Sequence, residues 1–249
     1  MSISTRKLKG PIELAVAGFT EFKTIVTRKE TIISYFICYG IINIASVKYA
    51  IQNPDSFLGF QGELILNSII SYFFCTAIYV ILENNRKKGM SLFSIGFTPF
   101  LKKSFALWGV NIIASIRIIL GTILLILPGI VLALRYIYIS EIKAIEQINN
   151  KEVLRKSTEL SKINRWRYIS ACLLILIGST ILRVIYLSIV SKFDPYLNQN
   201  FLLLIINEFF GGFITCWLYT TGYIAYLDAT ESHSSTKYNF NLADTSHRA

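Results

Sequence analysis

Long apolar runs separated by short basic segments constrain this chain more than any other feature of its sequence. A helix needs about 20 mostly apolar residues to cross a bilayer, because it rises about 1.5 Å per residue through about 30 Å of hydrocarbon. The 249-residue chain has six segments that reach or approach this length: 32–51, 64–82, 104–127, 128–145, 169–190 and 201–227. The pattern predicts about six transmembrane helices.

The composition favours a membrane domain without a separate soluble module. Hydrophobic residues make up 53% of the chain and charged residues only 16%, whereas a soluble domain has about 25% charged residues. We therefore expect an all-α, polytopic integral membrane protein with a single transmembrane domain over residues 1–227. Residues 228–249 are polar and rich in Ser and Thr, which predicts a disordered cytoplasmic tail.

The placement of lysine and arginine predicts the side of the membrane on which each loop lies. These residues gather in the N-terminal segment, after 64–82 and after 128–145, whereas the alternate connections hold only Lys48 and Lys192. Cytoplasmic loops carry the excess of Lys and Arg, so both termini are predicted to be cytoplasmic. The net charge of +10 is confined to these short segments. We therefore do not expect nucleic acid as a partner.

Residue types that carry catalysis or bind metals are sparse. Each of the four cysteines lies inside an apolar run, no two of them form a CxxC motif, and both histidines lie in the polar tail. This spacing does not fit a metal site, and the chain has no P-loop and no evident Ser-His-Asp set. We expect no metal, no cofactor and no enzymatic activity.

Pro128 and Gly129 interrupt the longest apolar stretch of the chain. A continuous helix over 104–145 would run about 60 Å, twice the thickness of the hydrocarbon. Proline disfavours helix at the preceding residue, and glycine accepts a positive φ. Together with the charge alternation, this predicts that Pro128-Gly129 form a structural turn on the outer side, which joins the two helices of a hairpin. A proline kink within one tilted span is the alternative.

Among the ionisable residues within the predicted spans, four are expected at similar depth in the outer half of the membrane: Arg117, Arg135, Arg183 and Glu208. Such residues usually face the bundle interior and find a partner. We expect Glu208 to pair with Arg117, Arg135 or Arg183, and we expect the remaining positive charge to attract an anion such as a lipid phosphate. Alternatively, the arginines extend to the outer headgroups and the role of Glu208 is structural. Glu141 is predicted to lie nearer the cytoplasmic surface.

Two similar pentads suggest an internal repeat: residues 18–22 read GFTEF and residues 96–100 read GFTPF, and each precedes a basic patch and a predicted span. In the first, Ile12, Phe19, Phe22 and Val26 fall on one helical face, which predicts an amphipathic cytoplasmic helix on the anionic inner leaflet. In the second, Thr98-Pro99 is typical of a helix start and would lead directly into the next span. Coincidence in short apolar windows is the alternative reading of the repeat.

The stretches LPGIVLALRY (127–136) and EVLRKSTELSKINRWRYI (152–169) resemble a group of uncharacterised bacterial inner-membrane proteins. These are related to the membrane domain of glycerophosphoryl diester phosphodiesterases. The resemblance covers roughly residues 121–174, and the matching positions are Leu127, Pro128, Gly129, Arg135, Ser157 and Leu160. It implies a multi-pass membrane fold in a bacterial inner membrane. No catalytic residue carries over, because the chain has no room for a soluble phosphodiesterase barrel.

Three functional readings follow, in decreasing order of support. The first is a non-catalytic membrane protein that interacts with membrane lipids, or that organises a complex with other membrane proteins or with itself. The second is a transporter or channel-like protein for an anionic or lipid substrate, which a broken span and buried arginines would suit. The third is a membrane-embedded lipid enzyme, for which only Glu208 is placed as an acid or base.

Overall fold

The computed structural model describes residues 8–26, 28, 57–87, 97–146, 148–190 and 201–246, and these are almost entirely helical. The helices are α1 (Pro11–Val26), α4 (Phe57–Lys87), α5 (Phe97–Leu124), α6 (Ile126–Arg135), α7 (Ile139–Glu146), α8 (Asn150–Val190) and α9 (Phe201–Ser246). The all-α prediction is confirmed for this part of the chain. The predicted span over 32–51 lies outside the described residues.

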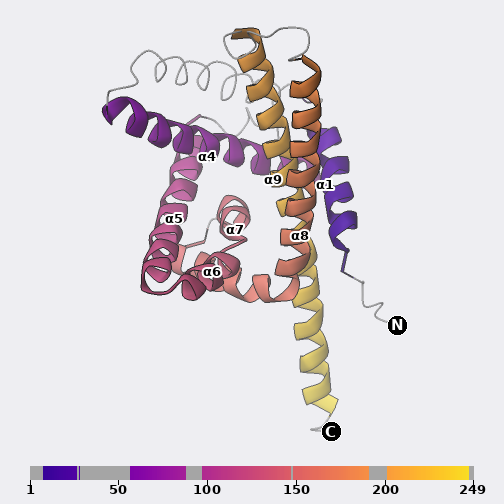
Figure 1. Cartoon of the computed structure of the whole chain (residues 1–249). Helices are drawn as coiled ribbons and strands as arrows, with labels where there is room; N and C mark the ends of the chain where they lie inside the picture. The colour runs from indigo at the N-terminus through magenta and orange to yellow at the C-terminus, as the bar shows by residue number, and fades with distance from the viewer. Residues whose placement is uncertain are drawn as a thin grey trace.

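Two long helices organise the molecule. The second half of α8 runs beside α9, and α1 packs against both of them (Figure 1). Helix α4 lies across one end and contacts both α5 and α9, while α7 sits in the centre, in contact with α4, α5, α8 and α9. The short α7 is therefore enclosed by four longer helices.

Helices α5 and α6 form an antiparallel hairpin. An added Cβ at Gly121 of α5 would lie 3.3 Å from the Gly129 Cα and 2.9 Å from the Leu132 Cδ1 of α6, so the two backbones lie close together. Beyond α6, the Arg117 guanidinium donates to the Tyr136 hydroxyl at 3.3 Å, and the Ser140 hydroxyl of α7 donates to Asn111 Oδ1 at 3.4 Å. The chain reverses at Leu125, whose backbone is extended (φ −160°, ψ 136°).

The Pro128-Gly129 pair lies inside the first turn of α6 rather than at the reversal itself. Proline is tolerated in a first helical turn, because the amide that it lacks would have no partner within the helix. Gly129 is helical and lies against α5, where an added Cβ would come within 2.9 Å of the Thr122 Cα. Its role is therefore close helix packing, not the positive φ that the sequence suggested.

The prediction of one helix over 128–145 was wrong. Helix α6 ends at Arg135, residues 136–138 form a turn, and α7 has only eight residues. Two described segments are long and apolar enough to cross a membrane: Thr98–Leu124 in α5 and Asn150–Tyr186 in α8. Helix α7 lies outside both of them. The start of α5 at Phe97 agrees with the helix start predicted at Thr98-Pro99.

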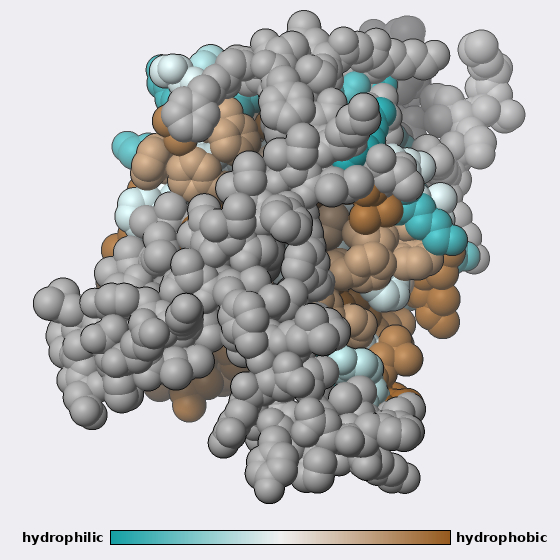
Figure 2. Space-filling view, turned by 90° about the horizontal axis from the view of Figure 1, so that it is seen from above, coloured by the Kyte–Doolittle hydropathy of each residue, from teal (hydrophilic) through white to brown (hydrophobic). Residues whose placement is uncertain are grey.

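Apolar side chains also cover much of the surface. Five consecutive residues at the tip of the α5–α6 hairpin are each at least 68% exposed: Ile123, Leu124, Leu125, Ile126 and Leu127. The second half of α8 likewise exposes aliphatic side chains between Leu173 and Ile185. Figure 2 shows brown apolar side chains reaching the surface on the right of the view. Patches of this kind mark contact with lipid or with another protein.

Two terminal segments differ from expectation. Helix α1 is amphipathic, but its buried face (Leu14, Ala15, Gly18, Phe22 and Ile25) packs against the bundle, and Ile12 is 69% exposed. The indole of Trp217 in α9 donates to the Ala15 carbonyl at 3.0 Å. This face is therefore covered by protein rather than by the inner leaflet. Residues 228–246 continue α9 as helix, and no glycine or proline interrupts this segment.

Candidate functional site

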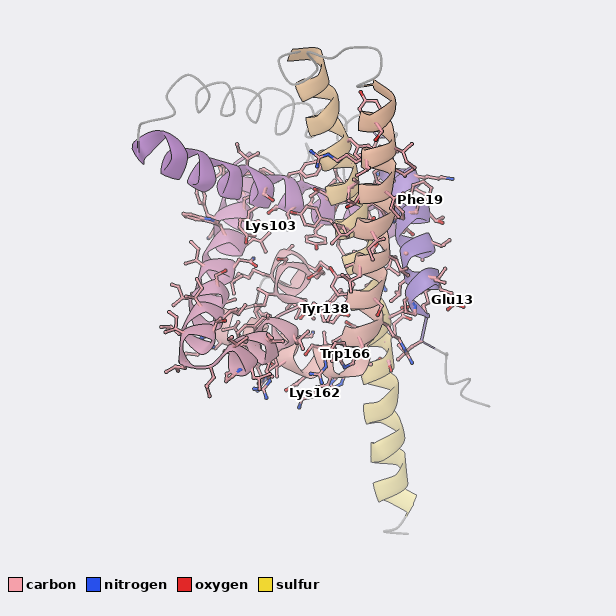
Figure 3. The ribbon with its side chains drawn as sticks, in the orientation of Figure 1. Glu13, Phe19, Lys103, Tyr138, Lys162 and Trp166 are labelled. Carbon is pink, nitrogen blue, oxygen red and sulfur yellow. The ribbon has the colours of Figure 1, made fainter. Side chains whose placement is uncertain are left out.

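The turn between α6 and α7 is fastened to α8 by buried polar side chains. Ser157 donates its hydroxyl to the Arg135 carbonyl at 2.9 Å and accepts the Tyr138 amide at 3.1 Å. The Tyr138 hydroxyl donates to Asn164 Oδ1, and the Asn164 amide donates to the Ala225 carbonyl of α9 at 2.9 Å. Figure 3 shows Tyr138 between α7 and α8. These bonds fix the position at which α7 begins.

The same asparagine explains the bend in α8. Asn164 has a non-helical backbone (φ −141°, ψ 16°) inside this long helix and is only 3% exposed. Asparagine competes with helical hydrogen bonding through its own side chain. Here that side chain bonds Tyr138 and Ala225, so the local break in α8 is offset by bonds to two other segments.

Glu141 lies at the centre of this arrangement and is 2% exposed. The Tyr79 hydroxyl of α4 donates to its Oε1 at 2.8 Å, and its Oε2 has no hydrogen-bond partner among the described residues. On the α9 side the carboxyl faces Gly222, where an added Cβ would lie 2.5 Å from Oε1 and 2.9 Å from the Tyr168 hydroxyl. The glycine therefore provides the space that the carboxyl occupies.

The electrostatic surroundings of Glu141 favour its neutral form. No cationic side chain of the described part of the chain forms an ion pair with it. Burial raises the pKa of Glu141 from its usual 4.5 to about 7, although hydrogen bonds from its own backbone amide and from Tyr79 oppose this shift. A carboxyl group in this state can gain or lose a proton near neutral pH.

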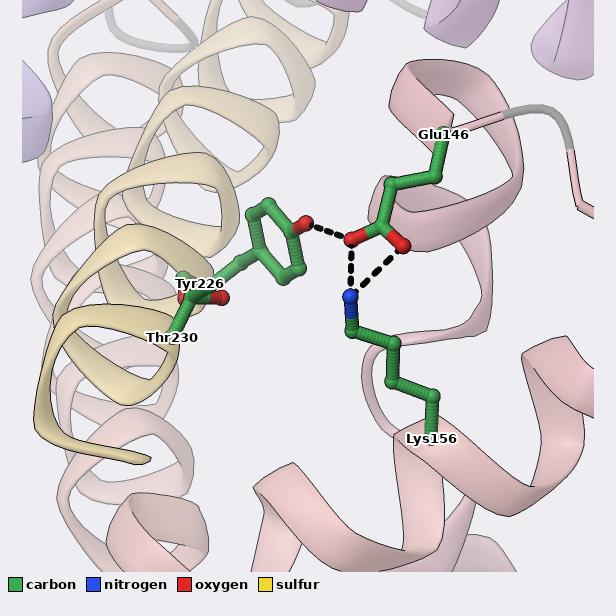
Figure 4. Close-up of polar contacts among 4 residues, drawn as sticks. All are labelled: Glu146, Lys156, Tyr226 and Thr230. Atoms are coloured by element: carbon green, nitrogen blue, oxygen red, sulfur yellow. Dashed lines mark hydrogen bonds and ion pairs between the residues drawn. The ribbon is translucent and has the colours of Figure 1, made fainter. Parts of the chain in front are cut away.

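A second carboxyl on α7 has a different environment (Figure 4). Glu146 pairs with Lys156 of α8, whose ammonium lies 2.6 Å from both carboxylate oxygens, and it accepts the Tyr226 hydroxyl of α9. Its charge is therefore balanced and solvated by protein donors. Two acidic residues on one short helix thus have contrasting partners: a lysine at Glu146 and neutral groups at Glu141.

The three arginines that the sequence predicts at the depth of Glu208 lie on the surface of the structure. Arg117, Arg135 and Arg183 are all exposed. Arg117 reaches Tyr136, the residue that follows Arg135, so these two arginines share one region of the hairpin. Arg183 lies near the C-terminal end of α8. The side chain of Glu208 lies outside the described residues, so its pairing with an arginine stays a prediction.

Sequence reasoning noted Glu141 but missed its burial, together with the roles of Tyr79, Asn164 and Gly222. One signal was available, since Glu141 is the only acidic residue in the apolar stretch that precedes Lys143. A buried acid with a perturbed pKa is a candidate functional group. The partners could not be identified, because they come from α4, α8 and α9, far away along the chain.

No family model, no curated protein and no solved structure matches this chain.

Proposed function

We propose that this chain is a multi-pass protein of a bacterial inner membrane that has no catalytic activity and binds anionic phospholipid headgroups. The binding site is the exposed face of the α5–α6 hairpin around Arg117, Arg135 and Tyr136. The observation that carries the proposal is a pair of exposed arginines on an apolar surface that has no acidic partner among the described residues.

The apolar surface around the arginines supports contact with lipid. Ile116, Ile119 and Leu120 on α5 are each more than half exposed, and so is Ile130 on α6. Their exposure to water would be unfavourable by about 25 cal/mol for each Å² of apolar surface. Inserted in hydrocarbon, the same side chains replace lipid contacts at little cost, and the hairpin needs no further protein cover.

The arginines then require an anion. An arginine at bilayer depth costs at least about 2.5 kcal/mol on insertion scales, and it lowers this cost by reaching toward a phosphate. A guanidinium can hold a phosphate through two parallel hydrogen bonds. Because Arg117 donates to Tyr136, a phosphate bound there would also lie within reach of a phenol hydroxyl.

The test compares lipid binding by the wild-type chain and by an Arg117→Gln, Arg135→Gln double variant in nanodiscs. Native mass spectrometry would count the phosphatidylglycerol and phosphatidylcholine molecules that stay bound. Each basic residue near an anionic surface contributes about 1 kcal/mol. We therefore expect the double variant to lose roughly thirtyfold in preference for phosphatidylglycerol.

A matched control removes two positive charges elsewhere. Arg155 and Lys162 are exposed on the first half of α8, and an Arg155→Gln, Lys162→Gln variant has the same net charge as the test variant. We expect it to keep the wild-type preference. An equal loss in both variants would mean that the arginines act only through net charge, and it would refute a specific headgroup site.

A further inference from the structure

The unsatisfied oxygen of Glu141 identifies a second site, independent of the hairpin surface. The carboxyl is surrounded by α4, α8, α9 and the turn before α7, whereas Arg117 and Arg135 face outward. Most buried polar atoms have a partner, and each exception calls for an explanation. Here Tyr79 satisfies one carboxyl oxygen and the other has no partner within the described residues.

The groups that face Glu141 decide what it can bind. The titratable side chains around it are Cys75 and Tyr79 from α4, Tyr138 from the turn, and Tyr168 and Cys172 from α8. From α9 the nearest contact is Gly222, and Tyr219 lies against the Tyr79 ring. All these side chains are uncharged at neutral pH in their ordinary states. None of them can balance the charge of an ionised carboxylate.

A metal ion does not fit these surroundings. Calcium and magnesium take six or more oxygen ligands, and zinc takes about four ligands from Cys, His or carboxylate side chains. Among the described residues, no group of three His, Cys, Asp or Glu side chains could hold a metal. A proton needs only one carboxyl oxygen, and its binding removes the buried charge altogether.

We propose that Glu141 is a proton-binding site in the core of the bundle, which takes up and releases one proton at its unpaired carboxyl oxygen. Proton binding neutralises a buried charge whose only side-chain donor among the described residues is Tyr79. Proton release leaves an unbalanced negative charge in the space beside Gly222 and Tyr168. Because α4, α7, α8 and α9 all contact this one group, its protonation state is linked to how these helices pack.

Isotope-edited infrared spectroscopy tests this site directly. The full chain, labelled with carboxyl-¹³C glutamate, is reconstituted into phosphatidylcholine vesicles and titrated between about pH 5 and pH 9, a range that brackets the titration expected for a desolvated carboxyl. We expect a protonated-carboxyl band that disappears with a midpoint about pH 7. The band should be absent from Glu141→Gln and present in Glu146→Gln, which alters the lysine-paired carboxyl on the same helix.

A second variant covers the case in which Glu141→Gln does not fold. Tyr79→Phe removes the hydroxyl that donates to the carboxylate, so the midpoint should move to higher pH. A band that persists in Glu141→Gln, or that does not change across the titration, would overturn the proposal. A midpoint that sodium chloride lowers and choline chloride does not would assign the site to a sodium ion instead.

Discussion

Replacing Glu141 with glutamine should flatten the pH dependence of stability. The pKa of Glu141 is raised from 4.5 to about 7 in the folded chain. Between these values the unfolded chain has lost the proton while the folded chain still holds it, so stability falls as pH rises. The contribution of protonated Glu141 to the free energy of unfolding is fully present below about pH 4.5 and is lost above about pH 7. Over that window the loss is about 3 kcal/mol.

The measurement is the free energy of unfolding in mixed micelles, followed by tryptophan fluorescence at a series of pH values. Wild type should lose about 2–3 kcal/mol between about pH 5 and pH 8, whereas Glu141→Gln should lack this slope. The slope is the informative quantity, because the amide also leaves buried N–H groups without partners, which costs about 1–3 kcal/mol at every pH.

Glu146→Gln is the control for this experiment, since Glu146 is paired with Lys156. It should be less stable than wild type, because the part-buried ion pair between Glu146 and Lys156 is lost, yet it should retain the slope that arises from Glu141. If Glu141→Gln and wild type lose the same free energy between these pH values, the buried carboxyl does not control the pH dependence and the reasoning fails.

Three further substitutions test packing and pairing. Gly129→Ala should cost about 1–3 kcal/mol in thermal unfolding, because its Cβ would lie 2.9 Å from the Thr122 Cα; an unchanged midpoint would mean that the helices separate freely. Ser157→Ala removes two bonds at the α6–α7 turn and should cost about 1–3 kcal/mol, more than Ser161→Ala, whose hydroxyl bonds only a carbonyl of its own helix. Glu208→Gln should reduce thermal stability if it pairs with an arginine, and a variant that inserts and unfolds like wild type would refute that pairing.

The helical character of the chain was predictable because it depends on local properties. Apolar runs of about 20 residues favour helices in a membrane, and Thr98-Pro99 indicated the start of α5 to within one residue. The break at Leu125 lies three residues before Pro128, so the sequence predicted its approximate place but not its cause, because Leu127, the residue before the proline, is helical. These features need no information from distant parts of the chain.

The division of 128–145 into α6 and α7 could not be predicted from hydropathy. The residues after Arg135 are as apolar as those before it, and nothing local marks a break. The turn exists because Ser157 and Asn164, on another helix, satisfy the polar groups of residues 135–138. Tertiary hydrogen bonds decided the backbone here, and the short helix that follows the turn carries Glu141 into the core of the bundle.

The contact between Ser157 and Arg135 bears on the role of the arginine itself. Ser157 bonds the backbone carbonyl of Arg135, which any residue at this position could supply. The exposed guanidinium therefore contributes nothing to fastening the turn, and a charged side chain on an apolar hairpin is unfavourable without a compensating partner. No acidic side chain among the described residues compensates it. The partner must come from outside these residues, either from a lipid phosphate, as proposed, or from Glu208. The lipid-binding and Glu208→Gln experiments together separate these two sources.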